Sequence, residues 1–153
     1  MNKLMIQPGL AVILLLVSAF SVALAAAEGG KYSSKYGPII ELLDEEQYQK
    51  AIDASKKALL KSPDNPDLFN YIAYSHRKLG QFEDAFVYYF KALEIDPEHR
   101  GANEYLGELY LQTGQLDKAQ ERLQVLDKEC FFPCAEYRDL KKAIKAYQKE
   151  NPA

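Results

Sequence analysis

The chain has 153 residues, of which 48% are hydrophobic and 27% charged, and its formal net charge at pH 7 is −3. This composition is typical of one folded domain and excludes a disordered chain, which would be less hydrophobic and more highly charged. The slightly acidic balance gives no overall positive field of the kind that nucleic-acid binding requires, so we expect no nucleic-acid partner.

The N-terminal region contains an uncharged segment, residues 4–27, directly after Lys3. Its Leu- and Val-rich part, residues 10–20, gives way to small residues that include Ala23-Leu24-Ala25, an A-x-A cleavage pattern. The sequence therefore predicts a signal peptide at residues 1–25, a short linker at 26–31, and an exported mature protein in the periplasm.

The alternative interpretation of this segment is an uncleaved anchor in the inner membrane. As a helix, residues 10–27 would span about 27 Å, close to the roughly 30 Å of a hydrocarbon core, so length does not decide between the two. The small residues at the end of the segment favour cleavage. Membrane contact is expected only if the segment stays uncleaved.

Three segments farther along the chain share a period of 34 residues, which indicates an internal repeat. Several independent landmarks keep this interval: the alanines Ala51, Ala85 and Ala119, the leucines Leu59 and Leu93, the prolines Pro63 and Pro97, and the glycines Gly80 and Gly114.

The middle segment shows the spacing of two successive helices. Phe69, Ile72, Ala73, His76 and Leu79 recur at intervals of three or four residues, as on one helix face, and residues 82–93 repeat that spacing. Glycine after the first helix and proline after the second provide stop signals. One such pair cannot bury its own apolar face, so stability must come from stacking on neighbouring pairs.

This period, with these landmarks, resembles the tetratricopeptide repeat, whose pattern runs W-x2-L-G-x2-Y, then A-x3-F, then P. The second unit, residues 66–99, matches best, with Ile72-Ala73 at the Leu-Gly place. The third, residues 100–133, has Leu106-Gly107 there, and the first, residues 32–65, is degenerate, with Glu46 at the place of the turn glycine. The resemblance implies an all-α fold, a right-handed α-solenoid of three helix-turn-helix units.

A capping helix and tail are predicted at residues 134–153. Tyr137, Leu140, Ile144 and Tyr147 form an apolar stripe, and the opposite side carries Arg138, Lys141, Lys142, Lys145 and Lys149. A terminal repeat needs a polar outer face for solubility, so we interpret the basic side as a solvated face. Contact with an anionic membrane or partner is the alternative.

Two cysteines, Cys130 and Cys134, lie at the junction between the third unit and the capping helix. A pair of cysteines in an exported chain favours a disulfide. Free buried thiols, or redox or metal chemistry, remain alternatives, although the spacing is not C-x-x-C and the chain has only two histidines, His76 and His99.

Catalytic patterns are scarce in this sequence. His76 lies on an apolar helix face, where a packed core histidine is expected, and the acidic residues Glu41, Asp44, Glu45 and Glu46 fit a solvated turn. There is no glycine-rich phosphate loop, zinc-ligand spacing or nucleophile elbow. We therefore expect no catalytic residue, no metal, no cofactor and no small-molecule substrate.

In the family that the chain resembles, the first helix of each repeat lines a concave groove that takes peptides or partner helices. Carried over place by place, the predicted protein-binding residues are Asp67, Asn70, Tyr74, Arg77 and Lys78 in the second unit and Glu104 and Glu108 in the third. We expect them to be exposed on one surface, with Tyr74 as an aromatic anchor. Tyr71 and Tyr105 stand where a chaperone-type carboxylate clamp needs asparagine, so that clamp is absent.

The mixed charges of these residues suit a polar, specific partner. The sequence therefore predicts an exported adaptor or scaffold that binds another protein or peptide through this groove. A structural or self-assembling module of an envelope complex is the alternative, and a thiol-redox protein is a more distant one.

Overall fold

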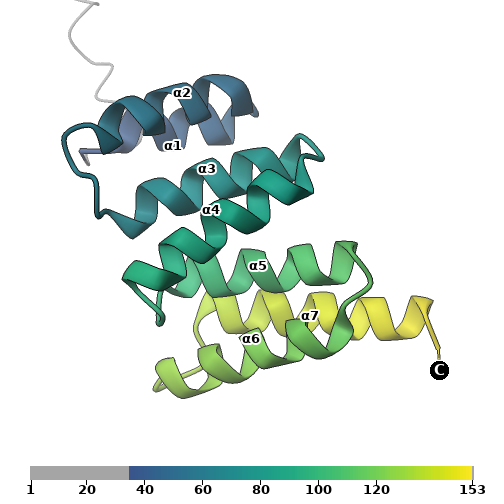
Figure 1. Ribbon diagram of the computed structural model, residues 1–153. Helices are drawn as coiled ribbons and strands as arrows, with labels where there is room; N and C mark the ends of the chain where they lie inside the picture. The colour runs from purple at the N-terminus through teal and green to yellow at the C-terminus, as the bar shows by residue number, and fades with distance from the viewer. Residues whose placement is uncertain (1–34, 153) are drawn as a thin grey trace, which may run out of the picture.

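The computed structural model describes residues 35–152. The predicted signal peptide, the linker and the first residues of the first repeat lie outside the described residues. Within residues 35–152 the chain forms seven helices and no strand, which confirms the predicted all-α helical-repeat fold (Figure 1). The helices are α1 (Gly37–Asp44), α2 (Tyr48–Leu59), α3 (Pro66–Lys78), α4 (Phe82–Ile95), α5 (Arg100–Gln112), α6 (Leu116–Glu129) and α7 (Ala135–Glu150).

The helices form two layers that follow one another down the stack. In the inner layer α1, α3, α5 and α7 each pack against the next. The backbones of α2, α4 and α6 pack on inner helices and do not approach one another closely within the described part of the chain. Because the inner helices touch while the outer ones spread apart, the stack curves, with its inner layer on the concave side.

The same backbone turn ends the first helix of every pair. At Gly80 the backbone has φ of 75°, the Gly80 N–H donates to the Arg77 carbonyl (3.0 Å), and the Gln81 N–H donates to the His76 carbonyl (2.9 Å). Gly114 repeats this arrangement, which is the Schellman ending of a helix. Glu46 adopts it too, with φ of 57°, although a side chain makes this left-handed conformation unfavourable.

Small residues allow the closest helix crossings. Ala51, Ala85 and Ala119 are fully buried, as expected for residues at helix contacts. The closest approach joins α5 and α7, where a Cβ added to Gly107 would lie 2.6 Å from a methyl carbon of Leu140. Glycine at this place therefore lets the capping helix pack directly against α5.

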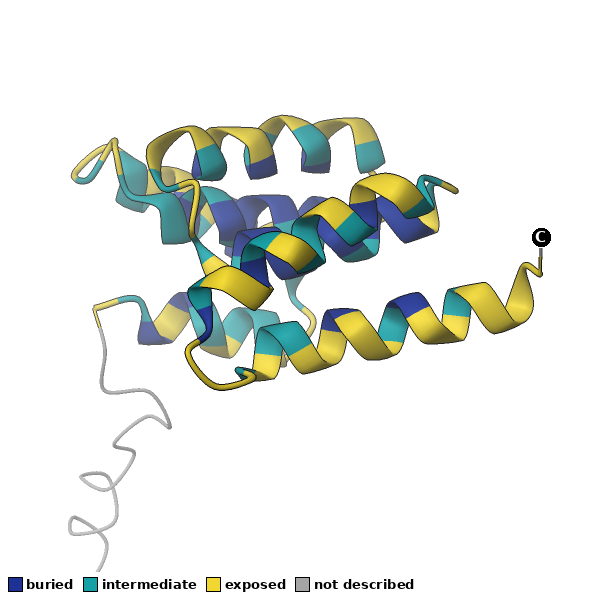
Figure 2. Ribbon diagram, turned by 90° about the horizontal axis from the view of Figure 1, so that it is seen from below, coloured by how far each residue is buried: buried dark blue, intermediate teal, exposed yellow. Residues whose placement is uncertain are grey.

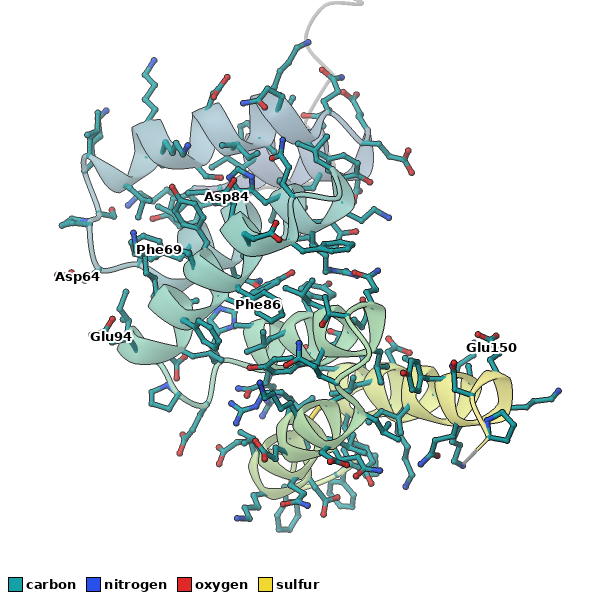
Figure 3. All side chains as sticks on the ribbon, turned by 45° about the vertical axis from the view of Figure 1, so that its right-hand side comes forward. Asp64, Phe69, Asp84, Phe86, Glu94 and Glu150 are labelled. Atoms are coloured by element: carbon teal, nitrogen blue, oxygen red, sulfur yellow. A yellow bond between two sulfur atoms is a disulfide. The ribbon has the colours of Figure 1, made fainter. Side chains whose placement is uncertain are left out.

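The last helix, α7, covers the end of the stack as the sequence predicts. Leu140 and Ile144 are buried against α5 and α6, while the basic residues on the opposite side are exposed. Figure 2 shows the C-terminal end of α7 extending past the other helices, and Glu150 marks that end in Figure 3. No helix within residues 35–152 has the length and apolar character needed to cross a bilayer.

Candidate functional site

A cleft of about 380 Å³ lies on the inner face of the stack. Four of the predicted groove residues, Asp67, Asn70, Tyr74 and Glu104, line it. All four inner helices contribute to the lining. It also includes residues that the sequence analysis did not assign to the groove: Ile40, Leu43, Asp44, Tyr71, His99, Tyr105 and Glu136.

Arg77 links α3 to α5 at one side of this cleft. Its guanidinium forms an ion pair with Glu108 (2.8 Å) and lies over the rings of Tyr74 and Tyr105, with its central carbon 5.3 Å and 5.6 Å from the ring centres. The two rings are themselves 4.9 Å apart. Ion pairing and cation–π contacts together compensate for removing this charge from water.

The expectation that all predicted groove residues are exposed is wrong for three of them. Asn70, Arg77 and Glu104 are only 5%, 7% and 7% exposed, so they are not the free surface residues that the sequence suggested. The inner helices approach one another closely enough to enclose these polar side chains. Tyr74 is half-buried, and Lys78 is exposed.

Lys78 lies next to the aromatic cluster and brings the ring of Tyr48 into it. Its ammonium lies 5.8 Å from the Tyr48 ring centre and 6.0 Å from that of Tyr74, and these two rings meet edge to face at 6.2 Å. Burial raises the pKa of the Tyr74 hydroxyl, which therefore remains a neutral donor at physiological pH. This part of the groove offers aromatic faces next to one exposed positive charge.

Glu104 gives the cleft an unbalanced acidic group. Burial raises its pKa to about 8, with further contributions from the nearby carboxylates of Glu108, Asp139 and Glu136, while Arg77 acts in the opposite direction. Among residues 35–152, no basic side chain forms an ion pair with it. The carboxyl is therefore mostly protonated at neutral pH.

Asn70 projects from the next inner helix into the same cleft. Its side-chain carbonyl oxygen is buried and has no hydrogen-bond partner among the described residues. Gly101 makes room for its amide, because a Cβ there would lie 3.1 Å from the Asn70 Nδ2 atom. The cleft thus presents an acceptor whose hydrogen-bonding capacity is unused, which is uncommon for a buried polar atom.

His99 joins two inner helices at the edge of the cleft. Its Nδ1 atom accepts a hydrogen bond from the Ala102 N–H (3.0 Å), which caps α5, so its Nε2 atom carries the proton and donates to Asp67 (3.0 Å). This hydrogen bond is the main reason why the pKa of Asp67 is lowered. The sequence analysis missed this link, since a histidine before Arg100 shows no helix-cap signal as plain as that of serine or asparagine.

The other histidine, His76, packs inside the second repeat as expected. Its Nδ1 atom lies 2.6 Å from the Gln81 side-chain oxygen, and its ring stacks on Tyr88 at 5.4 Å. Within residues 35–152, no group of three or more His, Cys, Asp or Glu side chains is arranged to hold a metal ion.

The cysteines lie away from the groove, between α6 and α7. Cys130 and Cys134 are at disulfide distance, with Cα atoms 5.7 Å apart. The short loop between them presents Phe131 and Phe132, which are 93% and 77% exposed and meet edge to face at 5.0 Å. These two aromatic side chains contribute nothing to the core.

Comparisons with known proteins agree with this architecture. The tetratricopeptide-repeat family model matches residues 76–144. A crystal structure of the Sgt2 TPR domain from Aspergillus fumigatus is similar, with a TM-score of 0.63 and 22% identity over 74% of this chain and 74% of that chain.

A second similar structure is that of the type III secretion chaperone SycD from Yersinia enterocolitica, in complex with a peptide of the translocator YopD. It has a TM-score of 0.62 and 16% identity over 75% of this chain and 87% of that chain. At these identities both structures support the fold alone. The matched family model and the 34-residue period agree with them, so residues 76–144 are similar to tetratricopeptide repeats and the described chain has the fold of such domains.

Proposed function

We propose that this protein is an adaptor that binds a segment of another protein in the groove formed by α1, α3, α5 and α7. The observation that carries the proposal is the cleft on the concave face, where tyrosine rings, carboxylates and an unpaired amide oxygen are gathered from four helices. Such a mixture of aromatic faces and fixed polar groups is suited to recognising a polar peptide segment. The SycD structure, which contains a bound peptide, gives a precedent for peptide binding on this fold.

The proposal includes export. The uncharged segment at residues 4–27 and its A-x-A pattern support secretion with cleavage after Ala25, and a pair of closely spaced cysteines suits an oxidising compartment. N-terminal sequencing of protein isolated from cells tests this directly. A mature chain that begins at or near Ala26 supports export, whereas an intact Met1 form in the membrane fraction would favour the anchored alternative.

An adaptor of this kind acts through binding alone. The arrangement of groove residues serves recognition, and the proposal assigns no catalytic residue, cofactor, nucleic acid or small-molecule substrate to it.

The experiment that tests the adaptor function compares groove and outer-face variants in partner capture. Tyr74→Ala removes an aromatic anchor and should cost about 2 kcal/mol of partner affinity. Lys78→Glu changes an exposed charge, so it should slow association and alter its salt dependence while leaving stability within about 0.5 kcal/mol. Val87→Ala, at an exposed position on the outer helix α4, is the matched control. The proposal fails if capture survives both groove changes and is lost in the control.

Self-assembly is the second candidate function, favoured by the exposed pair Phe131 and Phe132. Large exposed apolar side chains of this kind mark association surfaces in many proteins. Analytical ultracentrifugation of the protein and of Phe131→Ser with Phe132→Ser distinguishes the two functions. A monomer that saturably binds a partner supports the adaptor, and a concentration-dependent oligomer that the double substitution disrupts supports the assembly module.

A further inference from the structure

The lining of the cleft holds more acidic side chains than basic ones. Its acidic members include Asp67, Glu104 and Glu136, and no lysine or arginine belongs to the described residues that line it. His99 also lines the cleft, but its proton is already used in the hydrogen bond to Asp67. A bound cation would therefore find Glu104 and Glu136 without a lysine or arginine in the lining, and its charge would favour the ionised form of Glu104.

Two basic residues that contact the tyrosines of the groove are already engaged. Arg77 is held by Glu108 and by two tyrosine rings, and Lys78 lies over the rings of Tyr48 and Tyr74. The raised pKa of Glu104 agrees with this geometry, because a carboxylate with a committed counter-ion would have a lowered pKa.

Independent observations point to the kind of ligand. The buried Oδ1 atom of Asn70 is an acceptor without a donor, so it matches a ligand that carries N–H groups. The rings of Tyr71, Tyr74 and Tyr105 line the same space, and aromatic faces attract organic cations. Since no metal-binding group occurs within residues 35–152, the chemistry fits an ammonium or guanidinium rather than a metal ion.

We propose that this cleft holds a lysine or arginine side chain of the bound partner segment. Glu104 is its counter-ion, the Asn70 carbonyl oxygen accepts one of its hydrogen bonds, and the three tyrosine rings surround its charge. This inference rests on the proposed adaptor function and adds the chemical class of the residue that the partner inserts. The partner segment is accordingly expected to be basic at one position rather than uniformly apolar.

The first test uses N-acetyl-arginine amide and N-acetyl-lysine amide as probes, with N-acetyl-citrulline amide as the uncharged match for arginine. Nuclear magnetic resonance titration of the protein should show saturable shifts at Asn70, Glu104 and the cleft tyrosines, with at least tenfold weaker binding of the citrulline compound. Glu104→Gln keeps the shape of the side chain and should weaken arginine binding at least fivefold. Glu94→Gln, at the edge of α4 (Figure 3), should leave it unchanged. Equal binding of arginine and citrulline, or shifts confined to other surfaces, would overturn the inference.

The second test uses the partner segment captured through the groove. Replacing its basic residue with glutamine should reduce capture at least tenfold, and Glu104→Gln should remove that difference. If the groove captures a partner segment equally well without its basic residue, the proposed cation pocket is overturned and the adaptor function stays intact. If arginine amide binds in the cleft but no partner segment is captured through the groove, the adaptor function is overturned and, with it, the assignment to a partner side chain.

Discussion

The two ends of the helical stack are packed differently. At the N-terminal end α1 has only eight residues and buries just Gly37 and Ile39, and the turn after it places Glu46 in a left-handed conformation. At the C-terminal end α7 has sixteen residues and packs its Leu140 directly against Gly107. Because stability in repeat proteins is close to a sum of neighbour contacts, the first repeat should open before the last.

This difference matters for the groove, which receives residues from both ends. Ile40 and Leu43 come from the weakly packed α1, whereas Glu104, Tyr105 and Glu136 come from the firmly packed α5 and α7. A partner segment would therefore meet a fixed acidic and aromatic wall on one side and a more adjustable apolar wall on the other.

The largest expected effect is a change with pH in the free energy of unfolding, caused by Glu104 in the acidic wall of the groove. The pKa of Glu104 is raised from an ordinary 4.5 to about 8, so the folded protein binds this proton more tightly than the unfolded chain does. This contribution to stability is complete below pH 4.5 and is lost as pH rises toward 8, by up to about 1.4 kcal/mol per pH unit. Glu104→Gln should therefore be more stable than the parent at pH 8, with a difference that shrinks toward pH 5.

Urea unfolding of both proteins between pH 5 and pH 8.5 measures this difference, and Glu94→Gln serves as the control. A stability difference that does not change with pH would contradict the assigned environment of Glu104.

The next effect concerns the close crossing at the C-terminal end. Gly107→Ala should destabilise the protein by about 1–3 kcal/mol, because the new methyl group would overlap the Leu140 side chain. Helix propensity alone predicts the opposite sign, with alanine better than glycine by about 1 kcal/mol. In a Leu140→Ala background, Gly107→Ala should reduce the free energy of unfolding much less. A double-mutant cycle measured by chemical denaturation tests this. A more stable Gly107→Ala single variant would show that the two helices are not in such close contact.

The cysteines provide a test at the same end. We predict that Cys130 and Cys134 are paired in the native protein, and that replacing both with serine lowers stability by about 2 kcal/mol while the helical content remains. Alkylation under non-reducing conditions followed by mass spectrometry checks the pairing. Two labelled thiols in native material would refute it.

The smallest expected effect is a gain in stability at the weakly packed N-terminal end. Glu46→Gly relieves the left-handed backbone and should stabilise the first repeat by about 0.5–1 kcal/mol. Glu45, with φ of −82°, is the matched control, since Glu45→Gly only adds flexibility to the unfolded chain and should destabilise. Thermal denaturation compares the two variants, and a shift of the same sign in both would argue against backbone strain at Glu46.

The repeat architecture was accessible from sequence because its signals are local. Ala51, Ala85 and Ala119 keep the repeat interval. Gly80 and Gly114 mark turns that require a left-handed backbone conformation, which glycine adopts readily. These features depend on helix geometry and backbone conformation within each unit. They predicted the helical pairs without reference to contacts between units, as the apolar stripe of residues 137–147 predicted the capping helix.

The cleft was only partly accessible for the opposite reason. Its properties depend on distances between helices from different repeats, such as the approach of α3 to α5 that buries Arg77 and Asn70. In the sequence Glu136 looked like an ordinary acidic residue in a first helical turn, and Tyr71 and Tyr105 indicated only a missing clamp. Their shared position on the cleft follows from the curvature of the whole stack.

Site-specific photocrosslinking in intact cells tests the central claim most directly. A photoreactive amino acid at position 78, on the groove side, is compared with one at position 87, on the outer helix α4; both native side chains are exposed. The adaptor account predicts a discrete crosslinked partner from position 78 and none from position 87. A partner crosslinked from position 87 and absent from position 78 would contradict it.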